Sequence, residues 1–118
     1  MTWLFVMLGG GIGATLRYLL GSWLQPQSEF PWLTLIINIA GSFAIGWLWE
    51  SSATSPWFQS WGRPFLVIGI LGGFTTFSAF SLETLRLVES DQLGIAVMYV
   101  TASMVMCLLG VWAGFKLA

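Results

Sequence analysis

Long hydrophobic runs dominate this chain and are separated by short polar connectors. The runs are Trp3 to Leu24, Trp32 to Trp49, Pro64 to Leu82 and Leu93 to Phe115. Each has 18 to 23 residues, which at about 1.5 Å per residue can cross a hydrocarbon core about 30 Å thick. The first run contains a single charge, Arg17, and the other three contain none. The pattern therefore predicts an all-α integral membrane protein with four transmembrane helices.

The connectors are too short to hold a further domain. They cover Gln25 to Pro31, Glu50 to Arg63 and Glu83 to Gln92. The first hydrophobic run is longer than a signal-peptide core, and no A-x-A cleavage pattern precedes a soluble domain. We therefore expect the first run to be retained, and residues 1–118 to form one four-helix transmembrane domain.

Composition agrees with this class and argues against catalysis. Only 8% of the residues are charged, whereas a soluble domain carries about 25%. Histidine, the commonest general base and metal ligand, is absent. The single cysteine, Cys107, cannot form a disulfide within the chain and argues against a cysteine-based metal cluster. We expect no enzymatic activity.

The positive charges do not define one orientation in the membrane. Four crossings place both termini on one side, with Arg63 and Lys116 flanking the membrane there. Arg17 and Arg86 lie nearer the other side. A balanced count permits insertion in both orientations, and hence an antiparallel dimer. Four charges also make a noisy statistic, so a single orientation stays open at this point.

Polar side chains inside the runs are expensive in a membrane and indicate function. Most of them can donate a hydrogen bond, and none is acidic. They form three groups, one in each of the last three runs: Thr34, Asn38 and Ser42; Thr75, Thr76, Ser78 and Ser81; and Tyr99, Ser103 and Cys107. Any single serine or threonine can instead bond to its own helix. Asn38 is less easily satisfied, so we expect it to line a pathway or clasp a neighbouring helix.

The distribution of acids separates classes of transporter. All five carboxylates lie at or beyond the ends of the runs: Glu29, Glu50, Glu83, Glu89 and Asp91. A proton-coupled exporter of organic cations needs a buried carboxylate, so a small drug exporter is disfavoured but remains an alternative. Arg17 would raise the potential for an anion, although it could also snorkel to the interface. A non-transporting assembly subunit, with polar stripes that only hold helices together, is the third possibility.

Three motifs resemble the CrcB/Fluc family of fluoride channels. They are GGGIGATLRY (9–18), TLIINIAGSFAIG (34–46) and GILGGFTTFSAFS (69–81). The resemblance covers essentially the whole chain. It implies an antiparallel homodimer inserted in both orientations, with two fluoride pores. It also implies a third helix broken at mid-membrane and a structural sodium ion at the dimer centre, held by backbone carbonyls.

The resemblance also suggests roles for individual residues. By position, Phe77 and Phe80 look like the phenylalanines that line the pores, and Asn38 looks like the pore asparagine. Arg17 looks like the vestibule arginine. The remaining matches are Gly72 and Thr75 for the sodium site, and Tyr99, Ser103 and Cys107 for a polar track. Cys107 and Ala79 depart from the serine and threonine expected of the family, which weakens the line of donors locally.

Fluoride chemistry fits these side chains. Fluoride is small and strongly hydrated, so a pore must replace its water with hydrogen-bond donors, and we include Thr34, Ser78 and Ser81 among them. Phenylalanine edges are electropositive and can face an anion, although packing is the simpler explanation of the Phe77 and Phe80 spacing. We therefore expect a passive fluoride channel of a bacterial inner membrane. An inside-negative potential, worth about 2.3 kcal/mol per charge per 100 mV, would drive the anion out.

Overall fold

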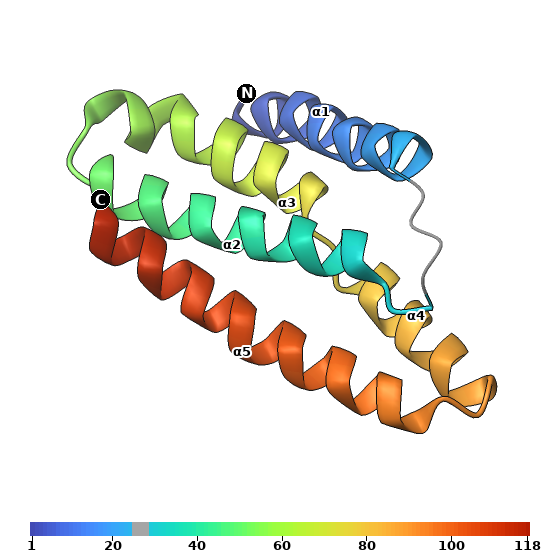
Figure 1. Cartoon of the computed structure of the whole chain (residues 1–118). Helices are drawn as coiled ribbons and strands as arrows, with labels where there is room; N and C mark the ends of the chain where they lie inside the picture. Colours follow the sequence, from blue (N-terminus) through green and yellow to red (C-terminus); the bar gives the residue numbers. More distant parts are fainter. Residues whose placement is uncertain (25–28) are drawn as a thin grey trace.

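The computed structural model describes residues 1–24 and 29–118, and their arrangement is entirely helical (Figure 1). The elements are α1 (Thr2–Trp23), α2 (Trp32–Ser51), η1 (Phe58–Leu71), α3 (Gly72–Phe74), α4 (Ser78–Glu89) and α5 (Leu93–Leu117). Taking Phe58–Glu89 as one segment, four segments are long and apolar enough to cross a membrane. The predicted all-α, four-span class is confirmed. Of the predicted connector Gln25 to Pro31, residues 25–28 lie outside the described part.

The third span is longer than its hydrophobic run. It begins at Phe58 and extends to Glu89, so much of the two flanking connectors is helical and their predicted bounds are wrong. At the start, the segment η1 is a π-helix that contains Pro64, and the Trp57 ring lies 5.8 Å from that of Phe58 and 5.4 Å from that of Trp61. At the end, glutamate, leucine and arginine are good helix formers even where hydrophobicity falls.

The helices pack in pairs through glycines. Helix α1 lies along η1 and α3, and α2 lies between this pair and α5 (Figure 1). A Cβ atom added at Gly13 would lie 2.8 Å from the amide nitrogen of Phe74, and one at Gly114 would lie 2.9 Å from that of Trp47. Such close backbone approach is typical of small residues in membrane helices. These glycines therefore serve interfaces within one chain.

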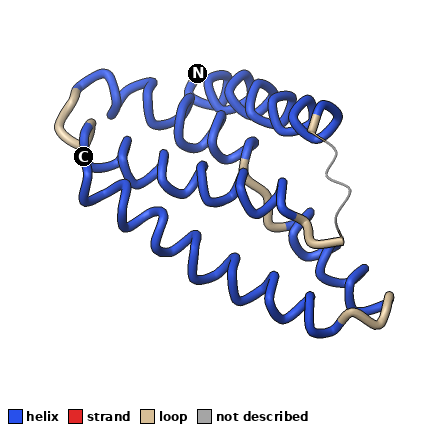
Figure 2. Tube along the Cα trace, viewed as in Figure 1, coloured by secondary structure: helices blue, strands red, loops and turns tan. Residues whose placement is uncertain are grey.

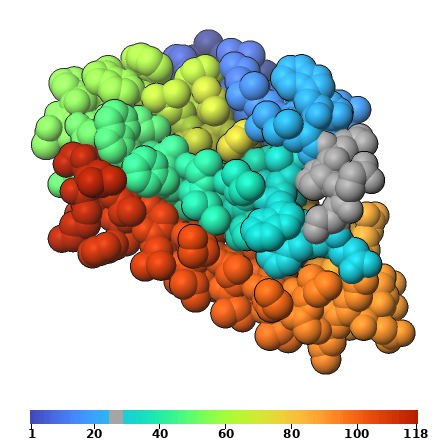
Figure 3. All heavy atoms as spheres, in the orientation of Figure 1, coloured from blue at the N-terminus to red at the C-terminus, as the bar shows by residue number. Residues whose placement is uncertain are grey.

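The buried apolar core is small. Its main cluster is formed by Leu35, Phe80, Leu87, Ala96 and Tyr99, contributed by α2, α4 and α5. Ile37 and Phe58 are also buried. Large apolar side chains are exposed on the outside of the helices instead. Figure 3 shows all heavy atoms of the chain as spheres in the orientation of Figure 1. Such a surface suits a lipid environment, in which apolar side chains gain nothing by avoiding the solvent.

The third span is interrupted between α3 and α4, as the short loop between them in Figure 2 shows. Thr75 leaves the helix with φ −82° and ψ 156°, and α4 begins at Ser78. The midpoint of the hydrophobic run Pro64 to Leu82 is Gly73, and a break at mid-membrane is therefore expected there. Gly72 and Gly73 are helical, so the departure from the helix comes after the glycine pair. Gly73 lies against α1, where a Cβ would be 3.1 Å from the amide nitrogen of Ala14. Its role is close packing, and its depth in a bilayer stays a prediction.

Candidate pore cavity at the helix interruption

A cavity of about 410 Å³ lies where the interruption faces α2 and α5. It brings together six of the predicted site residues: Asn38, Gly72, Thr75, Phe77, Phe80 and Ser103. The other residues of its wall are Ser42, Ile45, Thr76, Met104, Cys107 and Leu108. Three separate parts of the sequence therefore converge on one space, which we call the central cavity.

Asn38 holds the interrupted backbone in place. Its Nδ2 donates to the carbonyl oxygen of Thr76 at 2.9 Å, and its Oδ1 accepts from the amide of Thr76 at 2.9 Å. One side chain thus replaces both hydrogen bonds that Thr76 would make in a continuous helix. The carboxamide has two donor hydrogens, and only one is used in this pair. Asn38 therefore holds the non-helical segment that precedes α4. It also keeps one donor hydrogen for a ligand in the central cavity.

The two phenylalanines have different environments. Their rings are 5.4 Å apart and inclined at 48°. Phe80 is buried and lies 5.0 Å from the ring of Tyr99, whereas Phe77 is 69% exposed. Both line the central cavity, so one ring is fixed by its neighbours and the other stands free in this single chain.

Two hydroxyl groups on α5 are buried beside these rings. Tyr99 is fully buried and Ser103 is 7% exposed. Neither hydroxyl has a hydrogen-bond partner among the described residues. A buried polar group without a partner costs about 1–3 kcal/mol. Of the two, Ser103 lines the central cavity and Tyr99 does not. An unsatisfied donor in the wall of this cavity, such as the Ser103 hydroxyl, is what a small, strongly hydrated anion would need as a replacement for water.

The predicted sodium ligands, Gly72 and Thr75, have carbonyls that lack their helical donors. In a continuous helix these carbonyls would accept from the amides of Thr76 and Ala79. The Thr76 amide instead donates to Asn38, and the Ala79 amide donates to Thr76 Oγ1 at 3.1 Å. The Thr75 hydroxyl is itself used, because it donates to the carbonyl of Leu71 at 2.8 Å. Backbone oxygens, and not side chains, are thus what this segment offers to a hard cation.

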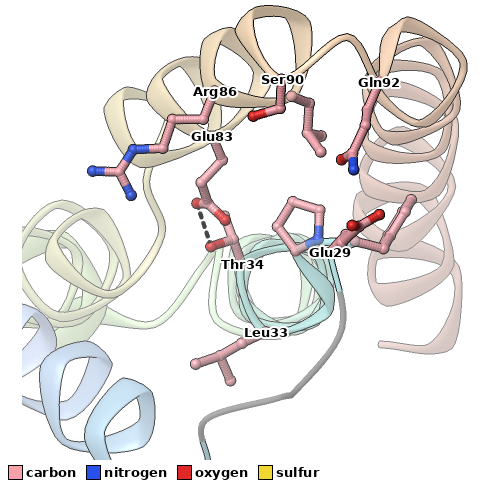
Figure 4. Close-up of a pocket in the computed structure, with 10 residues that line it drawn as sticks. Glu29, Leu33, Thr34, Glu83, Arg86, Ser90 and Gln92 are labelled. Atoms are coloured by element: carbon pink, nitrogen blue, oxygen red, sulfur yellow. Dashed lines mark hydrogen bonds between the residues drawn. The ribbon is translucent and has the colours of Figure 1, made fainter.

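Arg17 and Thr34 lie outside the central cavity. Both line a neighbouring groove of about 380 Å³. Arg17 Nε donates to the carbonyl oxygen of Gly73 at 3.3 Å, where a cation also complements the C-terminal end of a helix. Thr34 donates to the carboxylate of Glu83 at 2.7 Å, in the pocket shown in Figure 4.

Ser78 and Ser81 are exposed on α4 and line none of the cavities described here. The Ser81 hydroxyl donates to the carbonyl of Phe77 at 2.9 Å. The Ser78 hydroxyl lies 3.3 Å from that of Thr76. Within one chain the Ser81 hydroxyl therefore bonds to its own helix, and the Ser78 hydroxyl bonds to a side chain of the interruption.

Sequence reasoning missed two participants. Thr76 was noted only as one of several hydroxyls, yet its backbone pairs with Asn38 and its side chain accepts from the amide of Ala79. The available signal was the pair of adjacent β-branched threonines, which favours a departure from helix. Glu83 was placed at the end of a run, and its hydrogen bond with Thr34 needs the tilt of α4, which the sequence does not contain.

Comparison with known proteins agrees with this geometry. Residues 4–115 match the family model described as CrcB-like protein, Camphor Resistance (CrcB). A relative from Agrobacterium fabrum is 46% identical over 95% of this chain and 91% of its own length. Relatives from Thermus thermophilus and Oceanobacillus iheyensis are 43% and 44% identical, each over 98% of this chain and over 91% and 89% of their own lengths. All three are named fluoride-specific ion channel FluC. The chain therefore belongs to the CrcB family, a family of multi-pass membrane proteins whose members are named as ion channels and not as enzymes.

Proposed function

We propose that this protein is a passive, fluoride-selective channel that releases fluoride from the cytoplasm across a bacterial inner membrane. The observation that carries the proposal is the central cavity. Asn38, Phe77, Phe80 and Ser103 converge there from three places in the sequence, and no carboxylate is among its lining residues. Relatives that match nearly the whole chain are named fluoride-specific channels. The cavity has donors for an anion and no group that would bind a coupling proton.

Each side chain in the central cavity has a defined task in this proposal. The unused Nδ2 hydrogen of Asn38 and the Ser103 hydroxyl replace water around the ion. The edges of Phe77 and Phe80 supply weak positive potential, so that the anion is stabilised without being trapped. Fluoride would pass between donors and ring edges down its electrochemical gradient.

The proposed assembly is an antiparallel homodimer with two pores and one structural sodium ion. The Phe77 ring is exposed in the single chain, and a second protomer would cover this ring. In such a dimer the two interruptions meet at the symmetry axis. Each would present the carbonyls of Gly72 and Thr75, whose helical donors are engaged elsewhere. These carbonyl oxygens would coordinate the sodium ion, and the ion would thereby fix the position of one protomer relative to the other.

Efflux from liposomes tests the channel itself. We expect fluoride to leave liposomes that contain the purified protein when potassium efflux is permitted by an ionophore, and chloride to be retained under the same conditions. Equal rates for the two anions would contradict selectivity. A requirement for a proton gradient would contradict a passive pathway.

A second test addresses sodium through the backbone. Thr75→Ala should keep any stabilisation of the detergent-solubilised dimer by sodium, because the proposed ligands are carbonyls. Thr76→Val should weaken it, since the freed amide of Ala79 can then bond to the carbonyl of Thr75 and compete with the ion. Thr76→Ser, which keeps the hydroxyl acceptor, is the matched control. Identical thermal unfolding of the wild type in sodium and in a bulky organic cation would argue against the site.

A further inference from the structure

An aromatic cluster marks the end of the molecule where α2 finishes and η1 begins. The ring centroids of Trp49 and Phe58 are 6.5 Å apart, and Trp57 lies 5.8 Å from Phe58 and 5.4 Å from Trp61. Trp57 and Trp61 are both exposed. Tryptophan gathers at the level of lipid headgroups, because its ring is apolar and its indole N–H is polar. The cluster therefore places this end at a membrane–water interface.

A small pocket opens within this cluster. It has a volume of about 220 Å³ and is lined by Trp49, Ala53, Phe58, Gln59 and Arg63. This is several times the roughly 30 Å³ that one water molecule occupies in the liquid. We call it the interfacial pocket. It is separate from the central cavity, and no residue lines both.

Arg63 provides a cation that is positioned and still available. Its guanidinium carbon lies 4.8 Å from the centroid of the Trp49 ring. This contact with the ring is the one interaction of its side chain among the described residues. Stacking on a ring leaves the N–H groups at the edge of the guanidinium free, and that edge matches a phosphate in a two-pronged arrangement. Gln59 donates to the carbonyl of Ala53 at 2.8 Å, which leaves its second amide hydrogen for a ligand.

The charges of the two ends of the molecule favour an anion here. The end with the interfacial pocket carries Arg63 and Lys116 against one acid, Glu50. Toward the opposite end, Arg17 and Arg86 are outnumbered by four acids: Glu29, Glu83, Glu89 and Asp91. An anionic ligand is therefore attracted to the first end and repelled from the second.

We propose that the interfacial pocket binds the phosphate of an anionic phospholipid. Arg63 would hold the phosphate with the edge of its guanidinium, and Gln59 would add a hydrogen bond. The acyl chains would run along the exposed faces of Trp57 and Trp61. The site does not depend on fluoride transport. In an antiparallel dimer it would occur once in each leaflet.

Native mass spectrometry of the detergent-solubilised protein tests this site directly. Phosphatidylglycerol and phosphatidylcholine with identical acyl chains are each added to the wild type, to Arg63→Gln and to Lys116→Gln. We expect the wild type to retain phosphatidylglycerol over phosphatidylcholine. Arg63→Gln should bind phosphatidylglycerol about tenfold more weakly, since it loses a charged hydrogen-bonding partner. Lys116→Gln, which removes a charge at the same end but outside the pocket, should bind like the wild type.

Three results would overturn the proposal. One is equal retention of phosphatidylglycerol by Arg63→Gln and the wild type. Another is an equal loss in Lys116→Gln and Arg63→Gln, which would indicate diffuse attraction to charge and not a built site. The last is displacement of the lipid by millimolar inorganic phosphate, which would make a free anion the occupant. Arg63→Lys keeps the positive charge but lacks the two-pronged guanidinium edge. This variant should therefore show a partial loss of phosphatidylglycerol binding.

Discussion

At the scale of single residues, the pairing of Asn38 with Thr76 is the contact on which the central cavity depends. The carboxamide satisfies both the amide and the carbonyl of a residue that has left its helix. A side chain with only acceptors, or with no polar atoms, cannot do both. Substitutions at position 38 can therefore distinguish two effects: loss of the hydrogen bonds to Thr76 and addition of a charge to the central cavity.

Asn38→Asp should reduce fluoride efflux from liposomes by more than about tenfold. The carboxylate keeps an acceptor for the Thr76 amide but loses the donor to its carbonyl, at a cost of about 1–3 kcal/mol. It also adds a negative charge in the path of an anion. Asn38→Leu removes both hydrogen bonds without adding charge and should conduct better than Asn38→Asp. Efflux at the wild-type rate in both variants would mean that Asn38 does not line the pathway and that transport does not need its hydrogen bonds to Thr76.

The two phenylalanines should respond differently in stability and alike in transport. Phe80→Ile should lower the free energy of unfolding by about 1–3 kcal/mol, because Phe80 is buried against Tyr99. Phe77→Ile should change it by less than about 0.5 kcal/mol in the monomer, because the ring is exposed. Both variants should reduce fluoride efflux if both rings line the path. Unchanged efflux in both would leave these rings with a packing role alone.

At the scale of helices, glycines decide which surfaces approach. Gly46 on α2 and Gly114 on α5 face each other's helices, and a Cβ at either would meet backbone atoms. Backbone cannot move aside as a flexible side chain can. Gly94, on the same helix α5, has no atom within 4 Å of such a Cβ.

This contrast gives a matched pair of variants on one helix. Gly114→Ala should lower the free energy of unfolding by about 1–3 kcal/mol, because the added methyl group forces α5 away from α2. Gly94→Ala should be neutral or stabilising by up to about 1 kcal/mol, since alanine is the better helix former. Thermal unfolding of the purified proteins measures both. Equal effects in the two variants would mean that the approach of α2 and α5 is looser than described.

The four spans could be predicted from the sequence because their signal is a long one-dimensional pattern. The ends of the third span could not, because residues 58–63 and 83–89 are polar enough to read as connectors and become helical through ring stacking and helix propensity. The interruption could be located only to within a few residues. Glycines mark both helix breaks and close packing, and only the neighbouring α1 shows that Gly73 belongs to packing.

The types of residue that form the candidate site could be predicted from the sequence. Which of these residues share one cavity was harder to predict. Asn38, Phe77, Phe80 and Ser103 share the central cavity. Thr34 was expected beside them but lies in a neighbouring groove, together with Arg17, for which a place in a vestibule was expected. That separation depends on the rotation of α1 and on the tilt of α4 toward α2, neither of which a pattern of residue types specifies. The proposed roles of these residues stay predictions.

At the scale of the whole molecule, orientation in the membrane is the property most open to direct measurement. The basic residues are balanced, two toward each end, and short connectors leave no other strong determinant. We expect a tag at the C-terminus to be accessible from both sides of the membrane in a population of cells. Two lysines added beside Lys116 should drive every copy into one orientation.

The same variant tests the antiparallel dimer. If two opposed protomers are needed, a population with one orientation should lose fluoride transport, and coexpression with an oppositely biased variant should restore it. Full transport in the one-way population would exclude an antiparallel architecture. Wild-type chains that already show one orientation would exclude it as well.

The uneven placement of acids gives each protomer an electric dipole along the membrane normal. Four of the five carboxylates lie at one end and two of the four basic groups lie at the other. A lone protomer would therefore experience a torque and a shift in energy when the membrane voltage changes. Two antiparallel protomers have opposed dipoles that cancel, so voltage cannot favour one face of the proposed dimer over the other. Its fluoride current should therefore have the same size at equal voltages of opposite sign in symmetric solutions, without rectification.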